Sequence, residues 1–307
     1  MKLKTLLSAL AAAGLAVATG SAQASITFAF NPNGTGIGGA YLNAGILDQA
    51  PGNAIGLNAT NSGGPLAVGT VVTDYYQANL GTVQDLLTNN LFSNGVGGNY
   101  FTFVATFSET VIASSSGGGT VTNSFSIGSG TFKMCAQSAL GSNLAGTGFA
   151  CASNGILSGT IGGGNATQTG FPAALGALDQ AGINNYPGVQ TVQSSGASNL
   201  SATVTFANAG YFPDLNIGTR LVLATVNSSL ITPFAVVDPS AAFSSNTIAN
   251  GDAPGVSSVG VINGISGPNF MFQADANSSF TTVPEPGTLA LAGLALAGLS
   301  MLRRRAK

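Results

Sequence analysis

The middle of this 307-residue chain consists of runs in which apolar residues alternate with small polar ones. In the run 100–112, Phe101, Phe103, Ala105 and Phe107 fall on one face of an extended chain. Because successive side chains of a strand point to opposite faces, this spacing predicts a strand with one buried face. Further runs that we predict to be strands lie at 120–132, 200–206, 221–226, 231–237 and 270–275.

Turn-forming residues separate these runs and limit the length of any helix. Gly117-Gly118-Gly119 stands between the first two runs and predicts a hairpin loop, and the Gly-rich stretches 31–39 and 159–170 predict long exposed loops. Only 80–91 and 172–181 are candidates for short helices. Glycine occurs 44 times, and it disfavours helix interiors. We therefore expect a mostly β, sandwich-like domain with Gly/Ser-rich loops and few short helices.

The N-terminal segment has the three parts of a secretory signal peptide. Lys2 and Lys4 precede an apolar stretch, 6–19, and Ala22-Gln23-Ala24 fits a cleavage site for small residues. We predict a signal peptide at 1–24, with cleavage between Ala24 and Ser25. The alternative, an N-terminal membrane anchor, is disfavoured by the shortness of the apolar run.

The C-terminal segment combines a turn, an apolar run and a basic cluster. Pro284-Glu285-Pro286 precedes the apolar run 288–302, which stops at Arg303, Arg304 and Arg305. As a helix the run would rise ~22 Å, somewhat less than a bilayer core of ~30 Å. Arginines stay cytoplasmic, so a short transmembrane sorting helix would leave residues 25–283 outside as an exported β-rich domain. The alternative is a helix packed on the domain.

These tail residues resemble a known sorting signal. The Pro284-Glu285-Pro286 motif, the apolar helix and the arginine cluster are similar to the PEP-CTERM signal of Gram-negative bacteria, here spanning 284–307. The resemblance implies processing by an exosortase-type membrane enzyme after transient insertion into the inner membrane. It also implies a place on the cell surface or in an exopolysaccharide matrix.

Two internal segments carry a finer resemblance. Asp48-Gln49-Ala50-Pro51-Gly52-Asn53-Ala54 and residues 270–280 (FMFQADANSSF) are similar to segments of flocculation-associated PEP-CTERM proteins. This resemblance implies a role in floc or biofilm formation within an exopolysaccharide matrix. Low charge density also favours association between copies of the chain, because such copies repel each other weakly.

The charged residues exclude several functions. Residues 25–283 contain two bases, Lys133 and Arg220, and nine acids, a net charge of −7 that gives no footprint for nucleic acid. The chain has no histidine, so it lacks the commonest general base and metal ligand. Although two carboxylates could hydrolyse glycosides, no spacing selects a pair, and we expect the acids to be solvated surface groups. We predict no enzyme activity, no cofactor and no metal site.

Cys135 and Cys151 are the only cysteines of the chain. In an oxidising exported compartment such a pair is expected to form a structural disulfide. The alternative is a redox-active pair, although the C-x-x-C spacing of such pairs is missing.

The sequence thus predicts an exported matrix protein that promotes floc or biofilm formation with exopolysaccharide. A carbohydrate-binding module without a structural role and a secreted hydrolase are the competing hypotheses.

Overall fold

The computed structural model describes residues 25–36, 40–59, 64–151, 155–244 and 269–281. Residues Ile26–Phe280 form one compact unit. The predicted signal peptide and sorting helix lie outside the described residues. Within the described ranges, no helix has both the length and the apolar character needed to cross a bilayer.

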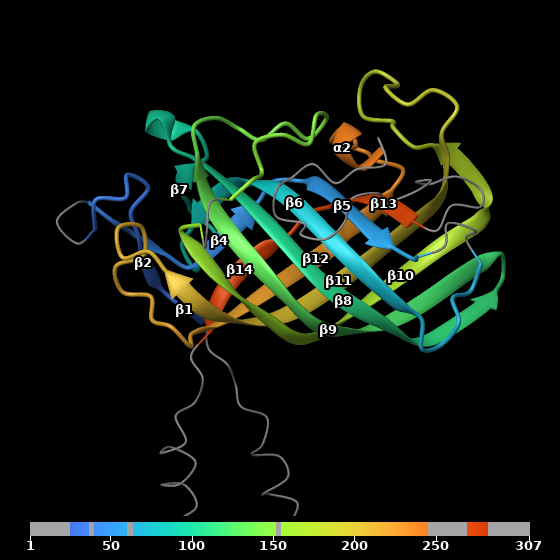
Figure 1. The fold of residues 1–307 in the computed structure, drawn as a ribbon, viewed down its shortest axis with the longest axis horizontal. Helices are drawn as coiled ribbons and strands as arrows, with labels where there is room; N and C mark the ends of the chain where they lie inside the picture. Colours follow the sequence, from blue (N-terminus) through green and yellow to red (C-terminus); the bar gives the residue numbers. More distant parts are fainter. Residues whose placement is uncertain (1–24, 37–39, 60–63, 152–154, 245–268, 282–307) are drawn as a thin grey trace, which may run out of the picture. The chain divides into compact units, whose positions relative to one another are not determined.

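The compact unit is built mainly of strands, which curve around a common interior (Figure 1). The first seven strands are β1 (Ser25–Ile26), β2 (Phe28–Phe30), β3 (Leu42–Ala44), β4 (Ile46–Gln49), β5 (Gly52–Leu57), β6 (Val71–Gln84) and β7 (Asn90–Ser93). The others are β8 (Tyr100–Gly117), β9 (Thr120–Gln137), β10 (Leu157–Ala177), β11 (Gln190–Ala207), β12 (Arg220–Thr232), β13 (Asn269–Ala274) and β14 (Asn277–Thr281). The helical elements that lie wholly within the described ranges include a 3₁₀ turn, η2 (Val96–Gly98), and a short α-helix, α2 (Ala241–Ser244).

One 12-stranded sheet takes the place of the two packed sheets that a sandwich would have. Neighbouring strands run β6-β5-β13-β12-β11-β10-β9-β8, and β8 pairs again with β6, so these strands close into a ring. The ladders along the ring are antiparallel, and β2 and β3 form a separate two-stranded sheet. Strands β8 to β11 are 18 to 21 residues long. Because strands twist, a sheet of such long strands coils and can meet its own edge.

Most predicted strands are present and are longer than predicted. The runs 100–112 and 120–132 lie in β8 and β9, and the glycine turn between them is confirmed. Gly117 pairs with Thr120, and the two residues of the turn, Gly118 and Gly119, have φ of 60° and 82°. Positive φ at both positions is the geometry of a tight hairpin turn, which glycine adopts without steric cost.

The prediction of a strand at 231–237 is wrong beyond Thr232. Strand β12, which also contains the predicted run 221–226, ends at Thr232 and is followed by Pro233. Proline has no N–H group to donate to a ladder, so a strand readily ends before it.

The two predicted helices are also wrong. Residues 80–84 end β6, and residues 172–177 continue β10. Leu80 and Val83 are at most 1% exposed. Their burial and the pairing of β6 with its neighbours outweigh the moderate helix propensity of the segment.

The stretch 159–170, predicted to be an exposed loop, is part of β10. A Cβ atom at Gly159 would collide with the carbonyl oxygen of Thr203 and with the ring of Phe132. At this position glycine permits a close approach of chains inside the sheet. In the other Gly-rich stretch, residues 31–36 do form a loop, but Asn31 is fully buried, and its side chain donates to Thr35 Oγ1 at 2.9 Å.

Buried side chains lie on both faces of the ring strands. The larger cluster includes Phe28, Phe30 and Phe101, with ring centroids of Phe30 and Phe101 5.4 Å apart. The smaller cluster contains one side chain from each of three strands: Ile55 of β5, Tyr75 of β6 and Met271 of β13. They pack against Leu178 and Phe234, which lie in loops, and against Phe243 of α2. The alternate residues of β5, β6 and β13 are therefore left to face the interior of the ring.

Candidate functional site

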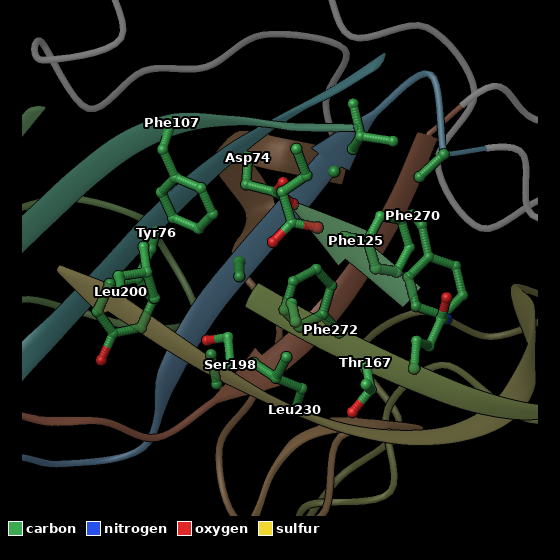
Figure 2. Close-up of a pocket in the computed structure, with 18 of the residues that line it drawn as sticks. Asp74, Tyr76, Phe107, Phe125, Thr167, Ser198, Leu200, Leu230, Phe270 and Phe272 are labelled. Atoms are coloured by element: carbon green, nitrogen blue, oxygen red, sulfur yellow. The ribbon is translucent and has the colours of Figure 1, made fainter. Parts of the chain in front are cut away.

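The interior of the ring contains a cavity of about 100 Å³. Every strand of the ring contributes side chains to its wall. Figure 2 shows Phe107, Phe125, Phe270 and Phe272 around this space together with Asp74. The wall is mainly apolar, with a few polar groups, which is the usual character of a small-molecule site.

Strands β6 and β8 position the polar part of this wall. Val72, Asp74 and Tyr76 alternate along β6 and face the cavity, and Phe107 and Glu109 do so on β8. In the ladder, Asp74 is paired with Phe107, and Val72 is paired with Glu109. Asp74 and Glu109 are thus diagonal neighbours on one face of the sheet, a separation that long side chains can span.

Both carboxyl groups are buried in the cavity wall. Asp74 is 5% exposed and Glu109 8%. Asp74 Oδ2 has no hydrogen-bond partner among the described residues. Neither Lys133 nor Arg220, the two bases of residues 25–283, lines the cavity.

Burial changes the protonation of this pair. It raises the pKa of Asp74 well above its usual value, and the neighbouring charge of Glu109 raises it further. Burial also raises the pKa of Glu109, to about 7. A charged carboxylate loses its hydration inside an apolar wall, and two such charges repel each other. The pair therefore releases its protons at higher pH than solvated carboxyl groups do.

Tyr76 connects the cavity to a second polar group. Its hydroxyl donates to Gln49 Oε1 at 2.9 Å. Burial, followed by the nearby charges of Asp275 and Asp48, raises the pKa of Tyr76 well above its usual value. Tyr76 is therefore a neutral hydrogen-bonding group at any physiological pH.

The prediction that the acids are solvated surface groups is wrong for Asp74, Glu109 and Asp179, all of them buried. One signal in the sequence could have revealed Glu109. It is an even number of residues away from Phe103 and Phe107, so its side chain lies on the same, apolar face of the strand. Similarly, Asp74 alternates with Val72 and Tyr76.

The cysteines are joined as the sequence predicts. A disulfide links Cys135, on β9, to Cys151, with a Cα–Cα distance of 5.6 Å. Ser25 begins β1. The other predicted site residues lie outside the described residues: Ala24, Pro284, Glu285, Pro286, Arg303, Arg304 and Arg305. No cluster of three or more potential metal ligands occurs within the described ranges.

The two segments 48–54 and 270–280 meet in space, which sequence spacing alone does not predict. Strand β13 pairs with β5, and β14 pairs with β4. Gln49 Nε2 donates to Ser278 Oγ at 2.8 Å, and both residues are buried. The two segments therefore lie side by side in the sheet and share a buried polar contact.

Comparison with known proteins identifies the tail. Residues 282–305 match a family model described as the PEP-CTERM protein-sorting motif. No curated protein and no solved structure matches the chain. The chain therefore carries a PEP-CTERM signal, which indicates an exported protein that passes through the membrane and is processed by an exosortase.

Proposed function

We propose that this chain is a non-enzymatic component of the cell surface or extracellular matrix, of the flocculation-associated kind, which promotes floc or biofilm formation together with exopolysaccharide. The observation that carries this proposal is the PEP-CTERM motif at residues 282–305, which is a sorting signal of exported proteins. The resemblance of residues 48–54 and 270–280 to flocculation-associated proteins supports it further.

The charge of the domain determines which contacts can hold a matrix together. With two bases in residues 25–283, direct ion pairing to an anionic polymer is weak. Bridging by divalent cations needs accessible carboxylates, and Asp74, Glu109 and Asp179 are buried. Cohesion would therefore depend mainly on uncharged contacts with sugars and with other copies of the chain.

Several loops present apolar side chains that suit such contacts. Leu87, between β6 and β7, is 80% exposed, and Ile183, between β10 and β11, is 82% exposed. Ile217, before β12, is 74% exposed. Contacts of this kind are short-ranged and insensitive to ionic strength, unlike ion pairs.

The residue types of the chain give little support to a hydrolase acting on a polymer. The chain lacks histidine, the commonest general base, and no pair of carboxylates with the spacing of a glycoside hydrolase is apparent in its sequence. We therefore propose that the protein contributes binding and cohesion.

Deletion of the gene tests the proposal. We expect a deletion strain to synthesise its exopolysaccharide in the usual amount while its cells disperse and settle slowly. Polymer yield and the settled fraction of cells are the two measurements. A deletion strain that settles as fast as the parent would exclude the matrix role.

A carbohydrate-binding module is the second candidate, and the exposed ring of Tyr41 favours it. This side chain is 57% exposed, and aromatic faces pack well against the apolar faces of sugars. Polysaccharide pull-down with the purified full chain, compared with a Tyr41→Ala variant, tests this candidate. A chain that binds polymer although its deletion leaves settling unchanged would be a module and not a cohesive component.

A further inference from the structure

The cavity inside the ring combines two features that a merely structural core does not need. Its wall is mainly apolar, and it nevertheless contains the carboxyl groups of Asp74 and Glu109. Burying a carboxyl group costs free energy unless hydrogen bonds or an opposite charge compensate it. A pair of buried acids that face an open space, with one carboxyl oxygen of Asp74 left without a hydrogen-bond partner among the described residues, therefore indicates a bound partner.

The unpartnered atom specifies what that partner offers. Asp74 Oδ2 is buried and receives no hydrogen bond from the described residues. Figure 2 shows the Asp74 side chain directed into the space between the phenylalanine rings. Once ionised, a carboxylate only accepts hydrogen bonds, so a partner that stabilises the ionised form of this pair must donate. Since neither base of the exported domain reaches the cavity, the partner must also bring any positive charge.

The remaining wall specifies size and polarity. Phe125 of β9 and Phe270 and Phe272 of β13 line the cavity. Their faces attract cations and exclude water from a hydrocarbon group. A volume of about 100 Å³ is smaller than the ~150 Å³ apolar cavity that is known to hold benzene, so the cavity suits a small ligand of roughly six heavy atoms or fewer.

We propose that the cavity binds a small apolar amine, with its ammonium group against Asp74 and Glu109 and its hydrocarbon part against the phenylalanine rings. The ammonium group supplies both the donor that Asp74 lacks and the counter-charge that the wall lacks. Binding places no demand on the exposed surface, so this site is independent of the matrix role.

Calorimetric titration of the purified full-length chain at pH 8 tests the proposal with two matched probes. Cyclopentylamine and cyclopentanol share one ring and differ in the head group alone. We expect the amine to bind on the order of tenfold or more tightly than the alcohol, since only the ammonium group can form charge-assisted hydrogen bonds with the carboxylates. Equal affinities, or no binding of either probe at millimolar concentration, would overturn the proposal.

Variants locate the site. Asp74→Asn and Glu109→Gln should each weaken amine binding on the order of tenfold and leave the alcohol nearly unchanged. Ala166→Leu, which fills the cavity from β10, should abolish binding of both probes. Asp85→Asn is the matched control, since Asp85 is an exposed carboxylate outside the cavity. Amine binding that survives both carboxyl variants and the filled cavity would place the site elsewhere and contradict the proposal.

The dependence on pH gives a readout that needs no variant. Asp74 and Tyr76 on β6 and Glu109 on β8 are the titratable side chains lining the cavity, and the linings from the other ring strands contain none. Because the pKa of Glu109 is about 7, the affinity for cyclopentylamine should rise between pH 6 and pH 8, and the affinity for cyclopentanol should not. Amine affinity that falls over this range would contradict the assignment.

Discussion

Asp74 and Glu109 are the residues whose chemistry departs most from that of the rest of the domain. In the folded state burial raises both pKa values, whereas in the unfolded chain both groups are solvated. The folded protein consequently binds more protons than the unfolded one between about pH 4.5 and pH 7. By linkage, the free energy of unfolding must fall as the pH rises through this window.

Replacing Glu109 with Gln should remove much of this dependence on pH. A shift from 4.5 to about 7 corresponds to roughly 3 kcal/mol of stability that is present at low pH and lost near pH 8. We expect Glu109→Gln to unfold at higher denaturant concentration than wild type at pH 8, with little difference at pH 4.5. Asp85→Asn is the control, because hydrogen bonds from Asn89 lower the pKa of Asp85 and place its titration below this window. A Glu109→Gln protein less stable than wild type at pH 8 would show that the charge is compensated.

The disulfide leads to the second prediction at this scale. Cys135 and Cys151 are 16 residues apart, and closing a loop of that length stabilises a protein by ~3 kcal/mol on the chain-entropy model. Cys135→Ala/Cys151→Ala should lower the free energy of unfolding by about that amount. Mass spectrometry of surface-derived protein should show a gain of two hydrogens on reduction, and free thiols before reduction would contradict the exported, oxidised state.

The alternation of residues along a strand predicts which side chains share a face of the sheet. It does not predict which strands become neighbours. The positions of Phe101, Phe103 and Phe107 predict a strand, and Glu109 continues the same face. The partner of Glu109 across the ladder lies on β6, tens of residues away in the chain. The register between distant strands depends on the whole sheet. The local sequence pattern therefore does not predict that Asp74 and Glu109 line the same cavity.

At the scale of elements, β10 shows how composition misleads. Its Gly-rich stretch predicts a loop, yet it lies between β9 and β11 along most of its length. The register shifts between Ile161 and Gly163, so the strand bends at its glycines. Glycine here provides bending and close approach instead of flexibility, a distinction that depends on neighbours supplied by the fold.

Two glycines of β10 make a matched pair for testing this role. Gly159 faces the backbone of Thr203 and the ring of Phe132, whereas nothing lies within 4 Å of a Cβ at Gly162. We expect Gly159→Ala to lower the free energy of unfolding by ~1–3 kcal/mol. Gly162→Ala should be neutral, or stabilising by ~0.5 kcal/mol through the unfolded state. Denaturant unfolding of both variants is the measurement, and equal effects would refute the close-approach argument.

At the scale of the whole molecule, the β-rich domain and the segments that direct its export occupy separate parts of the sequence. Six of the eight bases of the chain lie outside residues 25–283, in the two terminal segments. The tail could be predicted because its signal is contiguous, and the family match confirms the sorting motif. The closed ring could not be predicted from the sequence, because closure requires β6 to pair with β8, and β7 lies between them in the chain.

The basic end of the tail should control processing. Replacing Arg303, Arg304 and Arg305 with Gln removes the charges that hold this end in the cytoplasm. We expect unprocessed chain to accumulate in the inner membrane, as measured by mass spectrometry of membrane and surface fractions. Lysine at the same three positions keeps the charge and is the control. Surface protein from wild-type cells that still carried residues 289–302 would contradict processing.

Aggregates formed by the wild type should respond to chelation and salt as uncharged contacts do. We expect them to persist largely intact in a chelator and in moderate salt, because the nine acids are spread over residues 25–283 and three of them are buried. Turbidity and settled volume measure this directly. Prompt dissolution by the chelator alone would show that cations hold the matrix.

Settling of a deletion strain that re-expresses the chain tests the central claim most directly. Wild-type chain should restore the settled fraction of cells to that of the parent, and the chain with Arg303, Arg304 and Arg305 replaced by Gln should not, at equal expression and equal exopolysaccharide. A deletion strain that settles like the parent without any copy of the chain would contradict the account.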